Sequence, residues 1–211
     1  MASGPRTLKR NRSRLSLFPS QQDGSSLIDA VLHQEFDAIK EILQNYLDIN
    51  KHVKSGETLL HEIVKLEMDN EESRLSVVRD LLDFGADVSR KNRFGMTPLL
   101  LAVDLERPAN LVSLLLTPQS NIETSGPGGL TALHLAARKS SLETVKLLLN
   151  AGASSVIVDA MGKTALHEAA SAGQAEIAKL LVKRNPSTVA LVTHMGETPS
   201  QELVILRLSR L

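Results

Sequence analysis

The sequence of 211 residues contains no cysteine and no tryptophan, and aromatic residues make up only 2% of it. Without cysteine, disulfides, thiolate catalysis and cysteine-ligated zinc are excluded. So few aromatics argue against a large pocket for a small-molecule substrate and against a base-stacking surface. No apolar run approaches the roughly 18 residues of a membrane span, and no apolar segment of a secretory signal follows the basic start. We therefore expect a cytoplasmic or nuclear protein without a membrane partner.

The net charge of the chain is zero, but the charged residues are distributed unevenly. The chain has 24 basic and 24 acidic residues, yet residues 1–14 carry five basic residues and no acid, which leaves 19 basic against 24 acidic in the remainder. A basic tail thus precedes a mildly acidic body, and this argues against a broad nucleic-acid surface on the body. Residues 1–24 are poor in apolar side chains, and we expect them to be disordered.

Two patterns repeat along the rest of the chain with one period. Similar tetrapeptides begin at Thr58, Thr97, Thr131 and Thr164, a fifth begins at Thr198, and a glycine precedes each threonine by two positions. Apolar helical patterns recur at a constant distance before the first four threonines, at Ile39, Val78, Val112 and Val145. Both patterns repeat every 33 to 34 positions after a first, longer interval, and a period of about 33 residues indicates stacked supersecondary units.

The period, the Gly-x-Thr-[Pro/Ala]-Leu-His opening and the Leu-Leu-x-x-Gly-Ala ends at 81–86 and 148–153 resemble those of ankyrin repeats. The resemblance covers roughly residues 25–211. It implies an all-α solenoid of stacked helix–turn–helix units joined by hairpin-like loops. We divide it into units at about 25–55, 56–94, 95–128, 129–161 and 162–195, with a partial unit at 196–211.

Local chemistry fits such a unit. Thr131 and Thr164 can cap helices, and the resemblance implies that the histidine three positions later bonds across the turn. Gly85 and Gly152 stand where a helix end favours a left-handed residue, and Asn185 is the next-best residue for that role. Each helix pair leaves an apolar face that only a neighbouring pair can cover, so stability comes from stacking.

Several units depart from the pattern. Residues 25–55 read as a polar N-terminal cap, and the second unit has six extra residues around 66–73, which are strongly acidic. This insert is either a longer solvated helix end or loop, or an acidic contact for a basic partner. Leu100 replaces the usual histidine, so the third unit should be the least regular join. A single apolar helix fits 199–211, which either caps the stack or is continued by more chain or a partner.

The sequence contains no motif for catalysis or metal binding. His61, His134 and His167 occupy the structural position of the repeat, and no closely spaced pair of histidine ligands exists. No phosphate-binding glycine motif occurs, and the glycine-rich run 125–129 reads as a turn. We therefore expect neither enzyme activity, nor a metal site, nor a cofactor.

The resemblance also implies where a protein partner would bind, because ankyrin proteins bind through hairpin tips and the concave face of the first helices. Arg, Phe and Met, which are enriched at interface cores, occur among these positions. The predicted partner-binding residues are Arg90, Lys91, Arg93, Phe94, Asp104, Arg138, Lys139, Met161, Ser171, His194 and Met195.

The tail carries short motifs. Residues 9–12 resemble a basic nuclear-import signal, residues 9–17 resemble a kinase docking peptide, and Ser13 and Ser16 are candidate phosphorylation sites. We expect a non-enzymatic adaptor, scaffold or inhibitor that binds another protein. The alternatives are the substrate-recognition part of a larger enzyme or ubiquitin-ligase assembly and an NF-κB-inhibitor-like regulator. The latter lacks its expected Asp-Ser-Gly-x-x-Ser degron.

Overall fold

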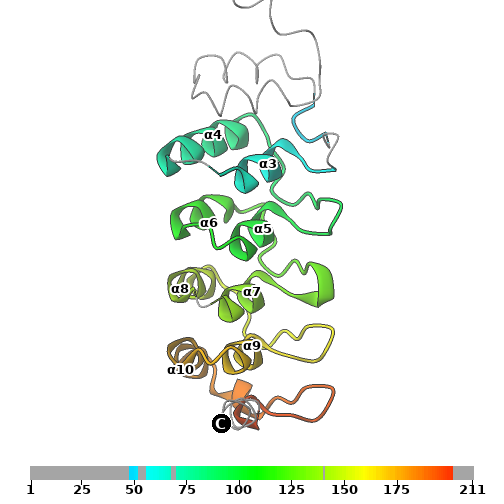
Figure 1. Cartoon of the computed structure of the whole chain (residues 1–211), viewed down its shortest axis with the longest axis vertical. Helices are drawn as coiled ribbons and strands as arrows, with labels where there is room; N and C mark the ends of the chain where they lie inside the picture. Colours follow the sequence, from blue (N-terminus) through cyan, green and yellow to red (C-terminus); the bar gives the residue numbers. More distant parts are fainter. Residues whose placement is uncertain (1–47, 52–55, 68–69, 140, 202–211) are drawn as a thin grey trace, which may run out of the picture.

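The computed structural model describes residues 48–51, 56–67, 70–139 and 141–201. Within these segments all regular structure is helical, so the fold is all-α. Four helix pairs stack along the long axis (Figure 1). The helices are α3 (Leu59–Lys65), α4 (Glu71–Asp83), α5 (Pro98–Asp104), α6 (Ala109–Leu115), α7 (Ala132–Arg138), α8 (Leu142–Asn150), α9 (Ala165–Ser171) and α10 (Ala175–Arg184), with 3₁₀ turns η2 (Pro127–Gly129) and η3 (Pro186–Ala190).

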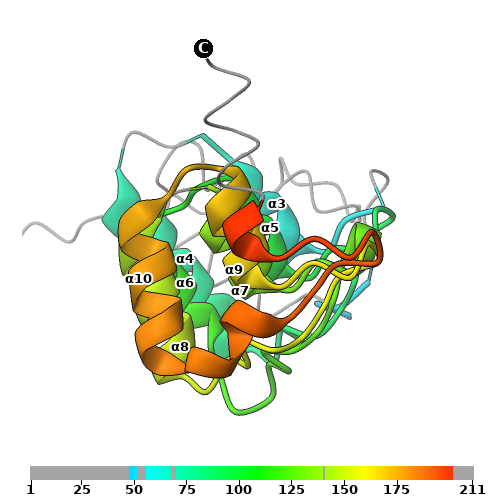
Figure 2. The same cartoon turned by 90° about the horizontal axis from the view of Figure 1, so that it is seen from below.

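The first and second helices of the pairs form two separate rows. Helices α3, α5, α7 and α9 form an inner row, and α4, α6, α8 and α10 form an outer row (Figure 1). The loops that join one pair to the next project beyond the inner row and lie over one another when the stack is viewed along its length (Figure 2). The loops therefore form a second, parallel stack beside the helices.

Each inner helix begins at a threonine whose backbone is extended. Thr58, Thr131 and Thr164 form capping boxes in which the histidine three positions later accepts from the threonine backbone N–H. This satisfies donors that the first turn of a helix leaves without partners. At Thr97 the hydroxyl alone caps the helix, accepting from the N–H of Leu100 at 3.3 Å. The expected loss of the Thr–His bond in this unit is confirmed.

Helix ends follow the glycine prediction in two units but not in the fifth. Gly85 and Gly152 have φ of +87° and +96°, in the left-handed region. Asn185 instead has φ −147°, and its side chain accepts from the N–H of Ser187 to start η3. The left-handed prediction for Asn185 was wrong because Pro186 follows it, and the residue before a proline is forced toward extended backbone.

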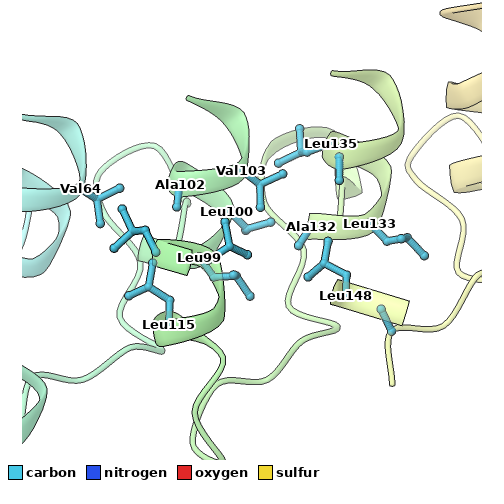
Figure 3. Close-up of a cluster of buried hydrophobic side chains, with 14 of the residues drawn as sticks. Val64, Leu99, Leu100, Ala102, Val103, Leu115, Ala132, Leu133, Leu135 and Leu148 are labelled. Atoms are coloured by element: carbon cyan, nitrogen blue, oxygen red, sulfur yellow. The ribbon is translucent and has the colours of Figure 1, made fainter. Parts of the chain in front are cut away.

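The core runs without interruption through the stack. Leu100 and Val103 from α5 lie beside Ala132 and Leu135 from α7 (Figure 3), and each of these side chains is at most 4% exposed. Small residues such as Ala136 and Ala169, both fully buried, let α7 and α9 approach closely. Burial of this contiguous apolar surface between units is the main source of stability in a solenoid.

Besides bonding across the turn as predicted, three histidines connect their units to the next one. The Nε2 atoms of His61, His134 and His167 lie 3.0, 3.0 and 3.2 Å from backbone carbonyls of the following hairpin, those of Met96, Lys163 and Glu197. Since Nδ1 faces the threonine N–H, the neutral ring must carry its proton on Nε2 to donate to the carbonyl. These side chains are structural, as the spacing predicted.

The six-residue insert is partly helix and is bound to the chain at several points. It lengthens α4, whose first turn holds Glu71 and Glu72. Glu67 and Glu72 are exposed, as the interpretation as a solvated helix end predicts. Arg74, just after the insert, is only 2% exposed; it pairs with Glu71 and donates to the Leu66 carbonyl at 2.6 Å. A buried arginine, which the sequence did not predict, therefore joins the two ends of the insert.

A second arginine, from the next unit, binds the first part of the insert and the end of α3. Arg107 donates to the carbonyls of Val64 and Lys65 at 2.9 and 2.7 Å, at the C-terminal end of α3, and pairs with Glu67 at 3.1 Å. Its hydrogen bond holds the pKa of Glu67 below the ordinary value. Glu106, just before it, has φ +54°, a conformation that is rare outside glycine. The equivalent residue of the fifth unit is Gly173.

The remaining predictions fall outside the described residues. They are the disordered tail 1–24 with Ser13 and Ser16, nearly all of the cap unit at 25–55, and the terminal helix beyond Gln201. Pro199–Gln201 do begin a helix where the sequence predicted one, after Thr198, whose hydroxyl accepts from the N–H of Gln201 at 3.4 Å.

Candidate protein-binding surface

Three of the projecting loops are tight hairpins, each held by one polar side chain. In each of them a side-chain oxygen accepts two backbone N–H groups across the turn: Asn92 from Phe94 and Met96, Asp159 from Met161 and Lys163, and Thr193 from Met195 and Glu197. These residues are buried. The tip residues beside them are therefore displayed from a fixed backbone, which lowers the entropic cost of binding.

Neighbouring hairpins are joined through the backbone. The N–H groups of Arg93, Ala160 and His194 donate to Gly56, Gly128 and Met161 at 3.2, 2.9 and 3.0 Å. The approach is closest at the last pair, where a Cβ added to Gly162 would lie 2.6 Å from the His194 ring and 2.7 Å from its backbone nitrogen. At Gly129 and Gly162 the stacking of the hairpins thus requires glycine, in addition to the positive φ of both residues.

One join in this row lacks those bonds. Pro127 stands where Arg93, Ala160 and His194 donate, and it has no N–H. Gly126 stands where Asn92, Asp159 and Thr193 cap the turn, and Leu100 replaces the histidine below. A Cβ added to Gly95 would meet nothing within 4 Å, in contrast to Gly162. The side-chain bond from Lys91 to the Ser125 carbonyl, at 2.8 Å, does bridge this join.

The tip of the hairpin at residues 90–96 is basic and aromatic. Arg93 stacks its guanidinium 4.6 Å above the Phe94 ring, and Phe94 is 58% exposed. Arg90 pairs with Asp87 at 3.6 Å. The Ser89 hydroxyl, by its hydrogen bond, lowers the pKa of Asp87, so that this carboxylate stays ionised beside Arg90. The predicted residues Arg90, Lys91, Arg93 and Phe94 therefore lie together on one tip.

The tips of the last two described hairpins are apolar. Met161 and Met195 are 60% and 81% exposed, and His194 is exposed beside them. Val158 and Val192, on the strand-like arms before the two turns, are also exposed. The bond from the His194 N–H to the Met161 carbonyl places the two hairpins side by side. The predicted residues Met161, His194 and Met195 thus form one patch, which the two valines enlarge.

The predicted residues of the inner helices bridge successive units. Asp104 pairs with Lys139 at 3.6 Å, and Arg138 pairs with Glu168 at 3.4 Å. Ser171 lies 3.5 Å from Lys163. The Asp104–Lys139 pair is partly exposed and contributes little to stability, since water screens it, whereas Glu168 is buried behind the exposed Arg138. The two pairs offer a face of alternating, mutually balanced charge.

A separate apolar groove of about 530 Å³ lies at the end of the described stack, lined by Ala169, Ala178 and Val182 with Lys179 at its edge. Val145 and Leu149, the equivalents of Ala178 and Val182 one unit earlier, are buried by the following pair. The groove is therefore the stacking face on which a further unit would pack. It belongs to the architecture of the repeat and not to the hairpin surface.

Among the described residues no group of acidic or histidine side chains is arranged to hold a metal ion. The same part of the chain has no helix long and apolar enough to cross a membrane. The hairpin tips and the inner-helix pairs are thus the surfaces in which the predicted site residues gather. What the sequence missed is the turn-holding set Asn92, Asp159 and Thr193, whose recurrence at the repeat period, with Gly126 in the place between, was its only signal.

Two family models of ankyrin repeats match the chain, one described as three copies at residues 106–190 and one described as many copies at residues 63–116. Together they cover residues 63–190, more than half of the sequence. The chain therefore belongs to the ankyrin-repeat family.

Curated relatives share this repeat within proteins of different kinds. A putative E3 ubiquitin-protein ligase, XBAT34, of Arabidopsis thaliana is 36% identical over 39% of this chain and 22% of its own length. Cyclin-dependent kinase 4 inhibitor B of Rattus norvegicus is 36% identical over 41% of this chain and 66% of its own length. The nuclear factor NF-kappa-B p105 subunit of Gallus gallus is 31% identical over 58% of this chain and 13% of its own length. The chain spans less than two thirds of each of these relatives.

Proposed function

We propose that this chain is a non-enzymatic protein-interaction module, an adaptor, scaffold or inhibitor of the cytoplasm or nucleus. It binds another protein, and neither nucleic acid nor a small-molecule substrate, through its hairpin tips and inner-helix face. The observation that carries this proposal is the row of exposed tip residues, Phe94, Met161 and Met195, on hairpins whose turns are fixed by buried polar side chains. Large apolar side chains held out in water by a rigid backbone are typical of interaction sites.

An alternative within the same proposal is that the chain recognises the substrate of a larger assembly. The relative named as a putative ubiquitin-protein ligase supports this version, and the p105 relative supports an NF-κB-inhibitor-like regulator. In both versions the repeat surface selects a protein, and a different part of the complex determines the fate of that protein. The same surface residues are therefore tested.

The experiment is affinity purification from cells with the wild-type chain and with a variant carrying Arg93→Ala, Arg138→Ala and Met161→Ala. We expect a small set of proteins that the wild-type chain captures and the variant does not. A matched control carries Arg79→Ala and Lys183→Ala, two exposed residues of outer helices. If wild type and variant capture identical proteins, the binding surface is assigned wrongly; if neither captures any protein above background, the module proposal itself fails.

A further inference from the structure

The hairpin row has two chemically different ends separated by a bare middle. One end, the basic end, is formed by Arg90, Lys91, Arg93 and Phe94, and Arg90 pairs there with Asp87 at 3.6 Å. The other end, the apolar end, is formed by Val158, Met161, Val192 and Met195.

Between the two ends the row presents almost no side chain. Gly126, Pro127 and Gly128 occupy the intervening tip, where Gly126 precedes the turn η2 and Gly128 within it has φ +69°. Pro127 and Gly128 are both exposed. A chain laid along the row can thus approach the backbone here, and only its two ends meet side chains that can select it.

We infer that the row recognises a segment of another protein that is acidic at one end and carries large apolar side chains at the other. The acidic side chains lie against the basic end and the apolar ones against the apolar end. This inference rests on the proposed interaction function and adds to it the chemistry and the direction of the partner.

The basic end is built to hold an anion in one geometry. The aliphatic stem of Arg93 packs over Gly56, where an added Cβ would lie 3.1 Å from the Arg93 Cβ, and its head is stacked on Phe94. A guanidinium fixed in this way keeps its edge for a carboxylate, to which it can donate two parallel hydrogen bonds.

The apolar end is suited to side chains of varied shape. Methionine is unbranched and polarisable, so Met161 and Met195 can adapt to an incoming aliphatic or aromatic group. The inner-helix residues do not compete for the charged end of such a segment, because Asp104 with Lys139 and Arg138 with Glu168 are balanced across units. Charge complementarity therefore favours the tips over the inner helices for the acidic contact.

The test is selection from a phage-displayed random-peptide library, with the whole chain as bait. We expect the wild-type chain to enrich peptides that combine acidic and apolar clusters in one fixed order. Arg93→Glu keeps part of the aliphatic stem and should replace the acidic cluster by a basic one. Met161→Ser with Met195→Ser should lose the apolar cluster and keep the acidic one. Arg79→Glu and Phe84→Ser, exposed changes on α4 and at its end, are the matched controls and should leave the selection unchanged.

Binding of one selected peptide, remade with its two clusters intact or exchanged, then measures direction. We expect each variant, and the exchanged peptide, to bind about tenfold more weakly. Rising salt should weaken binding of the double methionine variant more than binding of the Arg93→Glu variant, because only the former retains the complete basic end. The inference is overturned if selected peptides share no acidic–apolar order, if nothing is selected, or if a single-stranded oligonucleotide displaces the peptide from the basic end. Partner capture by the intact chain would in each case still test the proposed function separately.

Discussion

At the scale of the residue, the buried histidines do two jobs that depend on one protonation state. The Nδ1 atom of His134 accepts from the Thr131 N–H at 3.3 Å, and its Nε2 atom lies 3.0 Å from the Lys163 carbonyl. Burial lowers the pKa of His134 below its ordinary value of 6.5. A proton added at Nδ1 would remove the acceptor that the helix cap needs.

A pH dependence follows from this lowered pKa. Below pH 6.5 the unfolded chain takes up a proton at His134 that the folded chain refuses, so acid favours unfolding. The contribution of His134 is complete above pH 6.5 and is lost as the pH falls below it. His134→Leu, which copies the natural Leu100, should cost about 1–2 kcal/mol at pH 7. In urea denaturation between about pH 7.5 and 5, the free energy of unfolding should fall less steeply with decreasing pH in the variant than in the wild type. The same pH dependence in both proteins would contradict this account.

Two glycines with nearly the same φ differ in what surrounds them, which gives a second test. Gly95 has φ +76° with open space beside it, and Gly162 has φ +77° with the His194 backbone and ring in the way. Gly95→Ala should cost about 1–2 kcal/mol for the left-handed backbone alone. Gly162→Ala should cost at least about 1 kcal/mol more, because the hairpins must separate. Equal losses in thermal unfolding would mean that hairpin stacking contributes nothing.

These residues show how far sequence reasoning reaches at this scale. The threonine caps, the structural histidines and the left-handed Gly85 and Gly152 were predicted because each depends on a local pattern. Asn185 was mispredicted although the reason, Pro186, is its neighbour in the sequence. The basic tip was visible in the sequence, because Arg90, Lys91 and Arg93 are contiguous there, but the joining of Met161 to His194 and Met195 was not predicted, since it depends on which hairpins touch.

At the scale of the element, Arg107 in the loop of the next unit binds the end of α3 and the insert, and we call these contacts the Arg107 latch. Arg107 crosses from the α5–α6 loop to the carbonyl end of α3, where a cation is also favoured by the helix dipole. The acidic composition of residues 66–73 was visible in the sequence. Its pairing with Arg74 and Arg107 was not, because Arg107 belongs to the next unit and occupies no position that the repeat pattern marks.

Removal of this latch should loosen the second unit. Arg107→Ala leaves two carbonyls without their charged donor, and we expect a loss of about 2–3 kcal/mol in the free energy of unfolding. Arg79→Ala, which removes an exposed arginine paired with Glu72 at 3.5 Å, should stay within about 0.5 kcal/mol of wild type. Urea denaturation of the two variants tests this prediction. Similar losses in the free energy of unfolding would show that the contacts of Arg107 stabilise the chain no more than an exposed ion pair does.

At the scale of the whole molecule, the apolar core is continuous, but the series of backbone bonds between hairpins is interrupted before Pro127. Stacked repeats are coupled mainly to their nearest neighbours, so a local loss spreads until it reaches a weak join. The third unit was predicted to be the least regular join, in part because Leu100 replaces the usual histidine. Pro127 also lacks the backbone N–H that would bond to the preceding hairpin at this join, and Gly126 lacks the side chain that holds the turn in the other hairpins; neither effect was predicted from the sequence.

A perturbation at one end should therefore stop at this join. Leu60, on α3, is 1% exposed, and Leu60→Ala should cost about 2–5 kcal/mol. In native-state hydrogen exchange we expect the amides of α3, α4 and α5 to lose protection while those of α8 and α10 keep it. The mirror variant Leu181→Ala, which truncates a buried residue of α10, should expose α7 to α10 and spare α4. Loss of protection that spreads evenly through all four pairs in both variants would mean that core packing between α5 and α7 outweighs the missing hairpin bonds, and that the stack opens as a single unit.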